Sequence, residues 1–260
     1  LAYATDRKQG KSAARSGATG TIMDHADVRR MLTTMRADVF AARAIGLSCA
    51  VAIDMAHATG NPDWHARAAL LTPVAKSFGT DTGIAVSETG VQVHGGMGYI
   101  EETGAAQFSR DVRVTAIYEG TNGIQAMDLV GRKMMDGGDA AYRLLDEIEI
   151  FAEEARAQLP DLAEAVWQSA ETLRETTEWF VSRTDMNDRF AGAVPYLRGF
   201  ARVLGGYFHL KAAIAERGRT REALARFYIL RLLPEHTALF AHAQQGAADL
   251  YAIGVDELAA

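Results

Sequence analysis

A short acidic motif, Tyr118-Glu119-Gly120-Thr121, contains the side chain with the clearest potential for chemistry. A carboxylate between an aromatic ring and a glycine can be shielded from water, and desolvation raises a carboxyl pKa from about 4.3 towards neutrality. Such a group can act as a general base. Gly120 would let the backbone approach a substrate, and the amides of Thr121 and Asn122, at a helix start, suit an anionic ligand. Taken alone, however, the tetrapeptide favours a capping turn with a solvated glutamate.

A glycine-rich stretch, VQVHGGMGYI at residues 91–100, precedes this motif. Glycine is unfavourable inside helices, so such a cluster indicates a bend or a close approach of the backbone to another group. The stretch resembles a dinucleotide-binding fingerprint only loosely, because no βαβ unit surrounds it.

Other common catalytic arrangements are not indicated. The seven histidines show no HExxH or Cys-His ligand spacing, so no metal site is predicted. No Gly-x-Ser-x-Gly nucleophile elbow occurs. The single cysteine, Cys49, excludes an internal disulfide and lies in an apolar helical run, which favours a buried, inert thiol.

The elements that must position these motifs are predicted to be helical. Apolar spacing indicates a long helix over 24–58, and Asn61-Pro62 opens a second one that should close near Gly79 with a kink or break at Pro73. A weaker helical pattern covers 80–93.

The segments around the acidic motif give mixed signals. A short helix is predicted over 103–112 and another over about 121–135. Between them, VRVTAIY (112–118) alternates with period two, but no partner strand is evident, so an extended connection is predicted.

From residue 139 onward, four long helical patterns follow one another. One begins with Pro160 in its first turn, and the last two cover 187–217 and 219–253, with a kink expected at Pro234. Short connections predict antiparallel neighbours. We therefore predict an all-α fold: an antiparallel helical bundle over residues 1–135, then a second helical bundle over 136–260.

Composition limits the possible partners and compartment. The chain has 260 residues, 48% of them hydrophobic, and a formal net charge of −6, which argues against a nucleic-acid partner. We see no apolar run approaching the ~18–20 residues of a membrane span and no signal-peptide pattern, so a cytoplasmic location is predicted. The first residues lack Met and read as part of a helix, which suggests a fragment or a processed product.

Five motifs together resemble the C-terminal region of the acyl-CoA dehydrogenases. In the family's order and spacing they are AYATDRKQGK (2–11), HADVRRML (25–32), QVHGGMGYIEE (92–102), RDVRV (110–114) and IYEGTNGIQ (117–125). The resemblance is strong to about residue 135. Residues 140–260 resemble the additional C-terminal helical domain of a subset that includes the 3-methylmercaptopropionyl-CoA dehydrogenases. The joint pattern is specific, whereas each motif alone is not.

The resemblance implies an FAD-dependent oxidoreductase of fatty acid β-oxidation that converts an acyl-CoA thioester to a trans-2-enoyl-CoA. It implies that Glu119 removes the α-proton while its amide binds the thioester carbonyl, that Gly120 lies against the substrate, and that the β-hydrogen leaves as hydride to the flavin. An electron-transfer flavoprotein is the expected electron acceptor, and a homodimer or homotetramer is the expected assembly. The turn at 92–98 is expected to meet the FAD of a neighbouring subunit. By motif match, the expected FAD contacts are Arg7, Gln9, His25, Gln92, Gly95, Gly96, Thr121 and Asn122.

The sequence departs from the family pattern at three positions. Gly10 follows Gln9 where an aromatic residue is usual, and Ala26 and Gly123 stand where many members have glutamine, so those contacts are not expected. The family's N-terminal helical domain and middle β-domain lie outside the resemblance. Two alternatives stay open: an oligomerisation module that is catalytically inactive by itself, and an acyl-CoA oxidase.

Overall fold

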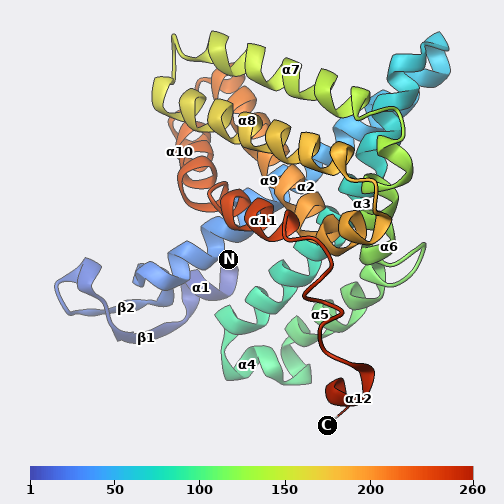
Figure 1. Ribbon diagram of the computed structural model, residues 1–260. Helices are drawn as coiled ribbons and strands as arrows, with labels where there is room; N and C mark the ends of the chain where they lie inside the picture. Colours follow the sequence, from blue (N-terminus) through green and yellow to red (C-terminus); the bar gives the residue numbers. More distant parts are fainter. Residues whose placement is uncertain (260) are drawn as a thin grey trace.

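The computed structural model describes residues 1–259, and the predicted all-α fold is confirmed (Figure 1). The helices are α1 (Ala2–Asp6), α2 (Ala26–Thr59), α3 (Pro62–His94), α4 (Gly96–Tyr99), α5 (Ala105–Arg113), α6 (Asn122–Val130), α7 (Asp139–Ala155), α8 (Pro160–Ser182), α9 (Met186–Glu216), α10 (Arg219–Phe227), α11 (Glu235–Ala243) and α12 (Val255–Leu258). A small antiparallel hairpin of β1 (Lys8–Lys11) and β2 (Thr19–Thr21), which was not predicted, projects beside α1 and α2.

Helices α2 and α3 form the long antiparallel pair that supports the site. The prediction of a helix over 24–58 is confirmed by α2, which ends at Gly60 in a left-handed conformation with φ of +66°. Asn61 then begins α3 by accepting a hydrogen bond from the amide of Asp63 at 2.8 Å. Pro62 follows in the first turn, where its missing N–H is not needed. A left-handed glycine and a capped start thus make the tight reversal.

The predicted end of this second helix near Gly79 is wrong, because α3 runs without interruption from Pro62 to His94. Pro73 is accommodated inside it, since Leu70, Val74 and other buried residues on the same face compensate for the lost hydrogen bond. One of the helix glycines serves packing. A Cβ at Gly83 would lie 2.9 Å from the side chain of Val112, so glycine here lets α5 approach closely.

Two further predictions near the acidic motif need correction. The expected extended connection at 112–118 is instead the end of α5 followed by a 3₁₀ turn, Val114–Ala116. The alternating pattern at 112–118 is too short to prevent α5 from continuing to Arg113. The helix predicted to about 135 ends at Val130, where Gly131 turns the chain into a second 3₁₀ turn at Arg132–Met134.

Helix α9 is the centre of the molecule. It packs against α2, α3 and α6 on one side and against α7, α8, α10 and α11 on the other (Figure 1). Its small residues permit this close packing: a Cβ at Gly199 would lie 2.2 Å from the ring of Phe240. Residues on both sides of position 135 therefore share one continuous core. The division into domains at 1–135 and 136–260 stays a prediction.

The last predicted helix, 219–253, changes direction near Pro234 as expected, but its predicted end at 253 is wrong, because the helical part ends at Ala243. Helix α10 passes into a π-helical turn at Tyr228–Leu232, and α11 begins after the proline and ends at Ala243. The amide of Leu233 reaches the carbonyl of Tyr228 at 2.9 Å, which closes the wider turn.

Helix α2 also differs from an expectation drawn from composition. By length and composition alone, it contains an 18-residue stretch that is long and apolar enough to cross a membrane. A core helix passes the same test, and one face of α2, including Ala37, Ala41 and Ile45, is buried in the molecule. The expectation that no run reaches this length is therefore wrong. Cys49, on the same helix, is buried as predicted.

His209, in α9, is a fully buried histidine with one unsatisfied nitrogen. Its Nε2 donates to the carbonyl of Ala37 at 3.1 Å, its ring stacks on Tyr228, and its Nδ1 has no partner within residues 1–259. Burial lowers the pKa of His209 to about 4, with a further lowering by the charge of Arg221. The imidazole is therefore neutral at pH 7 and can be protonated only at the cost of folding free energy.

Lowering the pH should destabilise the fold through His209. Because the folded pKa lies below the unfolded value of 6.5, the unfolded chain binds the proton more readily, and stability is lost as the pH falls from about 6.5 to 4. Between pH 7 and pH 4.5 the loss at this site should be about 2–3 kcal/mol. The measurement is urea unfolding at both pH values for the wild type and His209→Gln, which keeps a donor for Ala37. The wild type should lose more stability by this amount, whereas the exposed-site control His65→Gln should follow the wild type. Identical losses in wild type and His209→Gln would contradict the assignment.

Candidate functional site

Glu119 lies in the loop before α6 and has an unusual backbone. Its φ is +55°, and that of the following Gly120 is +79°. The left-handed conformation costs a residue with a side chain roughly 1–2 kcal/mol, because its Cβ approaches a carbonyl oxygen. Such residues persist only where their surroundings hold them, and they cluster at functional sites. The backbone therefore singles out the same residue as the sequence motif.

Hydrogen bonds from two helices hold this loop. Gln125 Nε2, in α6, donates to the Glu119 carbonyl at 3.0 Å. Lys76 Nζ, in α3, donates to the Gly120 carbonyl at 2.9 Å. Thr121 caps α6, because its Oγ1 accepts from the amide of Ile124 at 3.3 Å. The carbonyl groups of Glu119 and Gly120 are thus both held by side chains.

The side chain of Asn122 is occupied within the chain. Its Oδ1 accepts from Lys76 Nζ at 2.8 Å, and its Nδ2 donates to Asp81 Oδ1 at 2.6 Å and to Thr80 Oγ1 at 3.0 Å. The expected cofactor contact of Asn122 can therefore involve only its main chain. The Thr121 hydroxyl oxygen accepts the cap bond, which leaves its hydroxyl hydrogen available to donate to another group.

The carboxylate of Glu119 is exposed in this chain, so the partly apolar pocket expected from sequence is not formed by the chain itself. The loop lies at the surface, and none of the described elements covers it. Its neighbours Ile117, Tyr118 and Ile124 are each 54% exposed. Apolar side chains gathered at the surface around one acid indicate a face that another molecule or segment covers.

Five of the other predicted site residues gather around one cavity of about 430 Å³. They lie just after α1, in β1, just before α2, and at and just after the end of α3: Arg7, Gln9, His25, Gln92 and Gly95. His25 Nε2 donates to the Gln9 carbonyl at 2.9 Å, which ties the hairpin to the start of α2. The side chain of Arg7 makes one hydrogen bond within the described residues, to Gln9 Oε1 at 3.4 Å.

The glycines at the end of α3 leave space beside this cavity. Gly95 has φ of +60° and ψ of −141°, a conformation that only glycine adopts readily. A Cβ at Gly95 or Gly96 would meet no atom within 4 Å, whereas one at Gly98 would lie 2.3 Å from the Val91 carbonyl. Gly98 is therefore required by internal packing. Gly95 and Gly96 leave backbone accessible to another molecule.

The predicted site residues thus fall into two groups on one long helix. Lys76 supports the group Glu119–Asn122, and Gln92 belongs to the cavity group. At a rise of 1.5 Å per residue, these two positions of α3 are about 24 Å apart. The structure brings each group together but keeps the two groups separate.

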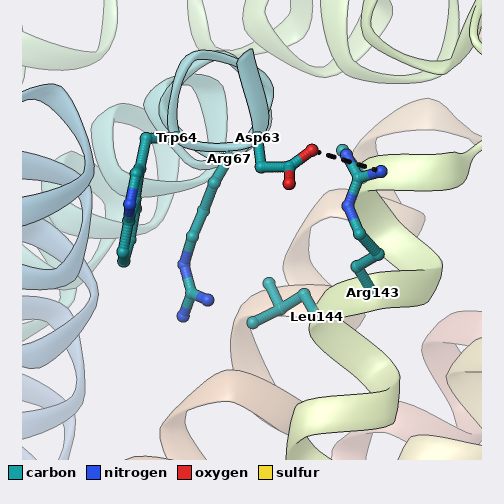
Figure 2. Close-up of a pocket in the computed structure, with 6 residues that line it drawn as sticks. Asp63, Trp64, Arg67, Arg143 and Leu144 are labelled. Carbon is teal, nitrogen blue, oxygen red and sulfur yellow. Dashed lines mark ion pairs between the residues drawn. The ribbon is translucent and has the colours of Figure 1, made fainter. Parts of the chain in front are cut away.

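Another pocket, of about 140 Å³ between the start of α3 and α7, offers less chemistry (Figure 2). Arg67 pairs with Glu147 at 2.5 Å, and Arg143 faces Asp63 at 3.7 Å and also pairs with Asp139. Both guanidinium groups are therefore neutralised within the chain. Within residues 1–259 no group of histidine, cysteine and acidic side chains could hold a metal ion.

Comparison with protein families decides the relationship. The family model described as the C-terminal domain of acyl-CoA dehydrogenases matches residues 3–135, half of the chain. The chain belongs to the acyl-CoA dehydrogenase family. A second family model, described as acetyl-CoA dehydrogenase C-terminal-like, matches residues 144–254. The recognition made from the motifs is therefore confirmed, including the additional C-terminal segment.

Individual acyl-CoA dehydrogenases are similar over much of the chain. The 3-methylmercaptopropionyl-CoA dehydrogenase of Ruegeria pomeroyi is 38% identical over 76% of this chain and 35% of its own length. A butyryl-CoA dehydrogenase of Syntrophomonas wolfei is 28% identical over 90% of this chain and 42% of its own length. The chain thus spans well under half the length of these relatives.

Solved structures share the fold. ACDH-11 of Caenorhabditis elegans, solved in complex with C11-CoA, matches 87% of this chain and 38% of its own chain with a TM-score of 0.73 at 20% identity. An acyl-CoA dehydrogenase of Bacillus anthracis, solved with FAD, matches 99% of this chain and 47% of its own with a TM-score of 0.58 at 16% identity.

Sequence reasoning missed the residues that hold the acidic loop. Lys76 is 43 positions before Glu119 in the sequence, in the middle of a helix, and no local motif connects the two. Gln125 lies within the recognised motif, but its contact with the Glu119 carbonyl depends on the left-handed turn. Such partners become visible only when the helices are placed in space.

Proposed function

We propose that this chain supplies the catalytic base and part of the cofactor site of an FAD-dependent acyl-CoA dehydrogenase. Glu119 removes the α-proton of an acyl-CoA thioester, and the product is a trans-2-enoyl-CoA. Bound FAD supplies the acceptor for the β-hydrogen, which leaves as hydride. The observation that carries this proposal is the clamped, left-handed backbone of Glu119 at the family's acidic motif.

The loop also offers donors for the thioester carbonyl. The amides of residues 119–122 donate to no backbone carbonyl in the described chain. Removal of an α-proton places negative charge on the thioester oxygen, and fixed amides aimed at that oxygen stabilise it. The amide of Glu119 is the proposed donor, and Gly120 leaves room for the substrate. The exposed Ile117, Tyr118 and Ile124 would then pack against the remainder of the enzyme and exclude water from the base.

The second group of residues fits part of an FAD. A cavity of about 430 Å³ is in the size range of cofactor subsites. The side chain of Arg7 makes one hydrogen bond within the described residues, so its guanidinium group is available to bind a diphosphate. Gly95 and Gly96 present open backbone. Arg7, Gln9, His25, Gln92, Gly95 and Gly96 would hold this part of the cofactor, and Thr121 and the main chain of Asn122 would contact FAD near the base. The separation of about 24 Å along α3 supports FAD molecules in two active sites of a homodimer or homotetramer.

The direct test is product formation by the full-length enzyme loaded with FAD. Acyl-CoA thioesters of different chain length, including butyryl-CoA and 3-methylmercaptopropionyl-CoA, are mixed with it anaerobically. We expect the flavin absorbance to bleach and the product to be two mass units lighter than the substrate with a trans-2 double bond. A panel that gives neither signal would reject the proposal.

Two alternatives have distinguishing measurements. The exposure of Glu119 favours a chain that is inactive without the remainder of the enzyme, and stoichiometric FAD binding and turnover by residues 1–260 alone would contradict this. An oxidase would release peroxide in air, whereas the dehydrogenase reduces electron-transfer flavoprotein anaerobically. We propose the dehydrogenase with that partner, in the cytoplasm.

A further inference from the structure

Lys76 directs its charge at the loop of Glu119. Its side chain is partly buried on α3, and its ammonium group makes two hydrogen bonds within residues 1–259, to the Gly120 carbonyl and to Asn122 Oδ1. Both acceptors belong to the loop and to the helix start that follows it. A lysine that only keeps the surface soluble would extend its ammonium group into water. Lys76 is partly buried and instead donates both of its hydrogen bonds to this loop and helix start.

The direction of these bonds matters for the amides. In a trans peptide the carbonyl and the N–H point in opposite directions, and the chain has no cis peptide bond. Gln125 holds the Glu119 carbonyl, so the Gly120 amide points the other way. Lys76 holds the Gly120 carbonyl, so the Thr121 amide points away from α3. The two side chains therefore point the Gly120 amide away from Gln125 and the Thr121 amide away from Lys76.

Asn122 makes the attachment rigid. Its amide lies between the cation of Lys76, which faces Oδ1, and the carboxylate of Asp81, which faces Nδ2 at 2.6 Å. The opposite charges fix the orientation of this amide. The loop is thus fastened to α3 at Gly120 and Asn122, on the C-terminal side of Glu119.

We propose that Lys76 is a positioning residue for the reaction: it fixes the Gly120 end of the loop so that the carboxylate and the amide of Glu119 keep their mutual placement. This inference rests on the proposed role of Glu119. Lys76 itself touches neither substrate nor reacting atoms. Losing the clamp lets the loop leave its left-handed conformation, and a displacement of about 1 Å at a reacting group can reduce a rate about 10²-fold.

The test uses the full-length, FAD-loaded enzyme with Lys76→Met, which keeps the length of the side chain but removes its donors. We expect kcat to fall about 10- to 100-fold while KM, FAD content and melting temperature stay close to wild type. The kinetic isotope effect with α-deuterated thioester should increase, because proton removal becomes the slow step. Lys76→Arg should recover part of kcat. The matched control is Lys133→Met, since Lys133 lies in the turn after α6 and near Asp128.

Several outcomes would overturn this inference. They are a wild-type kcat for Lys76→Met, an unchanged isotope effect, or a loss of kcat that only follows loss of FAD. If Lys76→Met does not fold, Gln125→Leu is used instead, because it loosens the same loop. A wild-type kcat for Gln125→Leu would then overturn the inference. If Glu119→Gln abolishes turnover while Lys76→Met does not, only the role of Lys76 fails. If Glu119→Gln remains active, the proposed function fails and the role of Lys76 with it.

Discussion

Replacement of Glu119 by glutamine in the intact enzyme should lower kcat by a factor on the order of 10²–10⁴. Glutamine has nearly the same shape and can keep the same backbone, but it cannot accept the α-proton. FAD content and the affinity for a thioester product should remain close to wild type, because the amides and the cavity are unchanged. The measurement is steady-state reduction of an artificial electron acceptor, together with the rate of flavin bleaching in a single turnover.

Glu102→Gln is the matched control for this experiment. Glu102 is an exposed acid in the turn between α4 and α5, and it should give wild-type kinetics. Turnover by Glu119→Gln within a few-fold of wild type would remove Glu119 from the mechanism. The family relationship would survive that result, whereas the assignment of the base would not.

Replacement of Arg202 by methionine should have the largest effect on stability. Arg202 lies in α9 with a side chain that is 8% exposed, and it pairs with Asp38 of α2 at 2.5 Å and with Glu235 of α11 at 2.6 Å. Its guanidinium also lies over the rings of Phe78 and Tyr228. Burial works against the charge, but the neighbouring Tyr228, Asp38 and Glu235 hold the pKa of Arg202 above its ordinary value. Arg202 therefore stays charged inside the protein.

Removing Arg202 leaves the largely buried Asp38 without its ion-pair partner, whereas Glu235 keeps Arg198. Loss of one partner of a buried ion pair costs about 3–5 kcal/mol. We expect this loss for Arg202→Met in urea unfolding at pH 7. Arg226→Met provides the comparison, because Arg226 and Asp161 form an ion pair whose side chains are 40% and 53% exposed. An exposed pair should contribute less than about 1 kcal/mol. Equal losses for the two variants would show that the Arg202 cluster does not join α2, α9 and α11 energetically.

The fold class followed from the sequence because helical periodicity is local. The apolar spacing of α2, the Asn61-Pro62 start of α3 and the proline at the start of α8 are all signals within a few residues. The errors occurred where local signals conflict with packing. Pro73 and Gly79 normally indicate a helix end, but the buried face of α3 against α2 and α9 outweighs them.

The family relationship was also a property of the sequence. The motifs around Arg7, Gln92 and Glu119, in the family's order, are sufficient to recognise an acyl-CoA dehydrogenase C-terminal region, and the family match agrees. Which residues would bind FAD followed from the same match and remains a prediction. The cavity formed by five of them supports it.

Only the tertiary structure decided how the loop of Glu119 is held and that its side chain is exposed to solvent. The bond from Lys76 to the Gly120 carbonyl and the bond from Arg202 to Asp38 join residues that lie 44 and 164 positions apart, and no local pattern encodes such contacts. The exposure of Glu119 is also a tertiary result, because shielding depends on which surfaces lie against the loop rather than on its own residues. Local interactions select the helices and the acidic motif, whereas orientation and solvent access are set by contacts between distant segments.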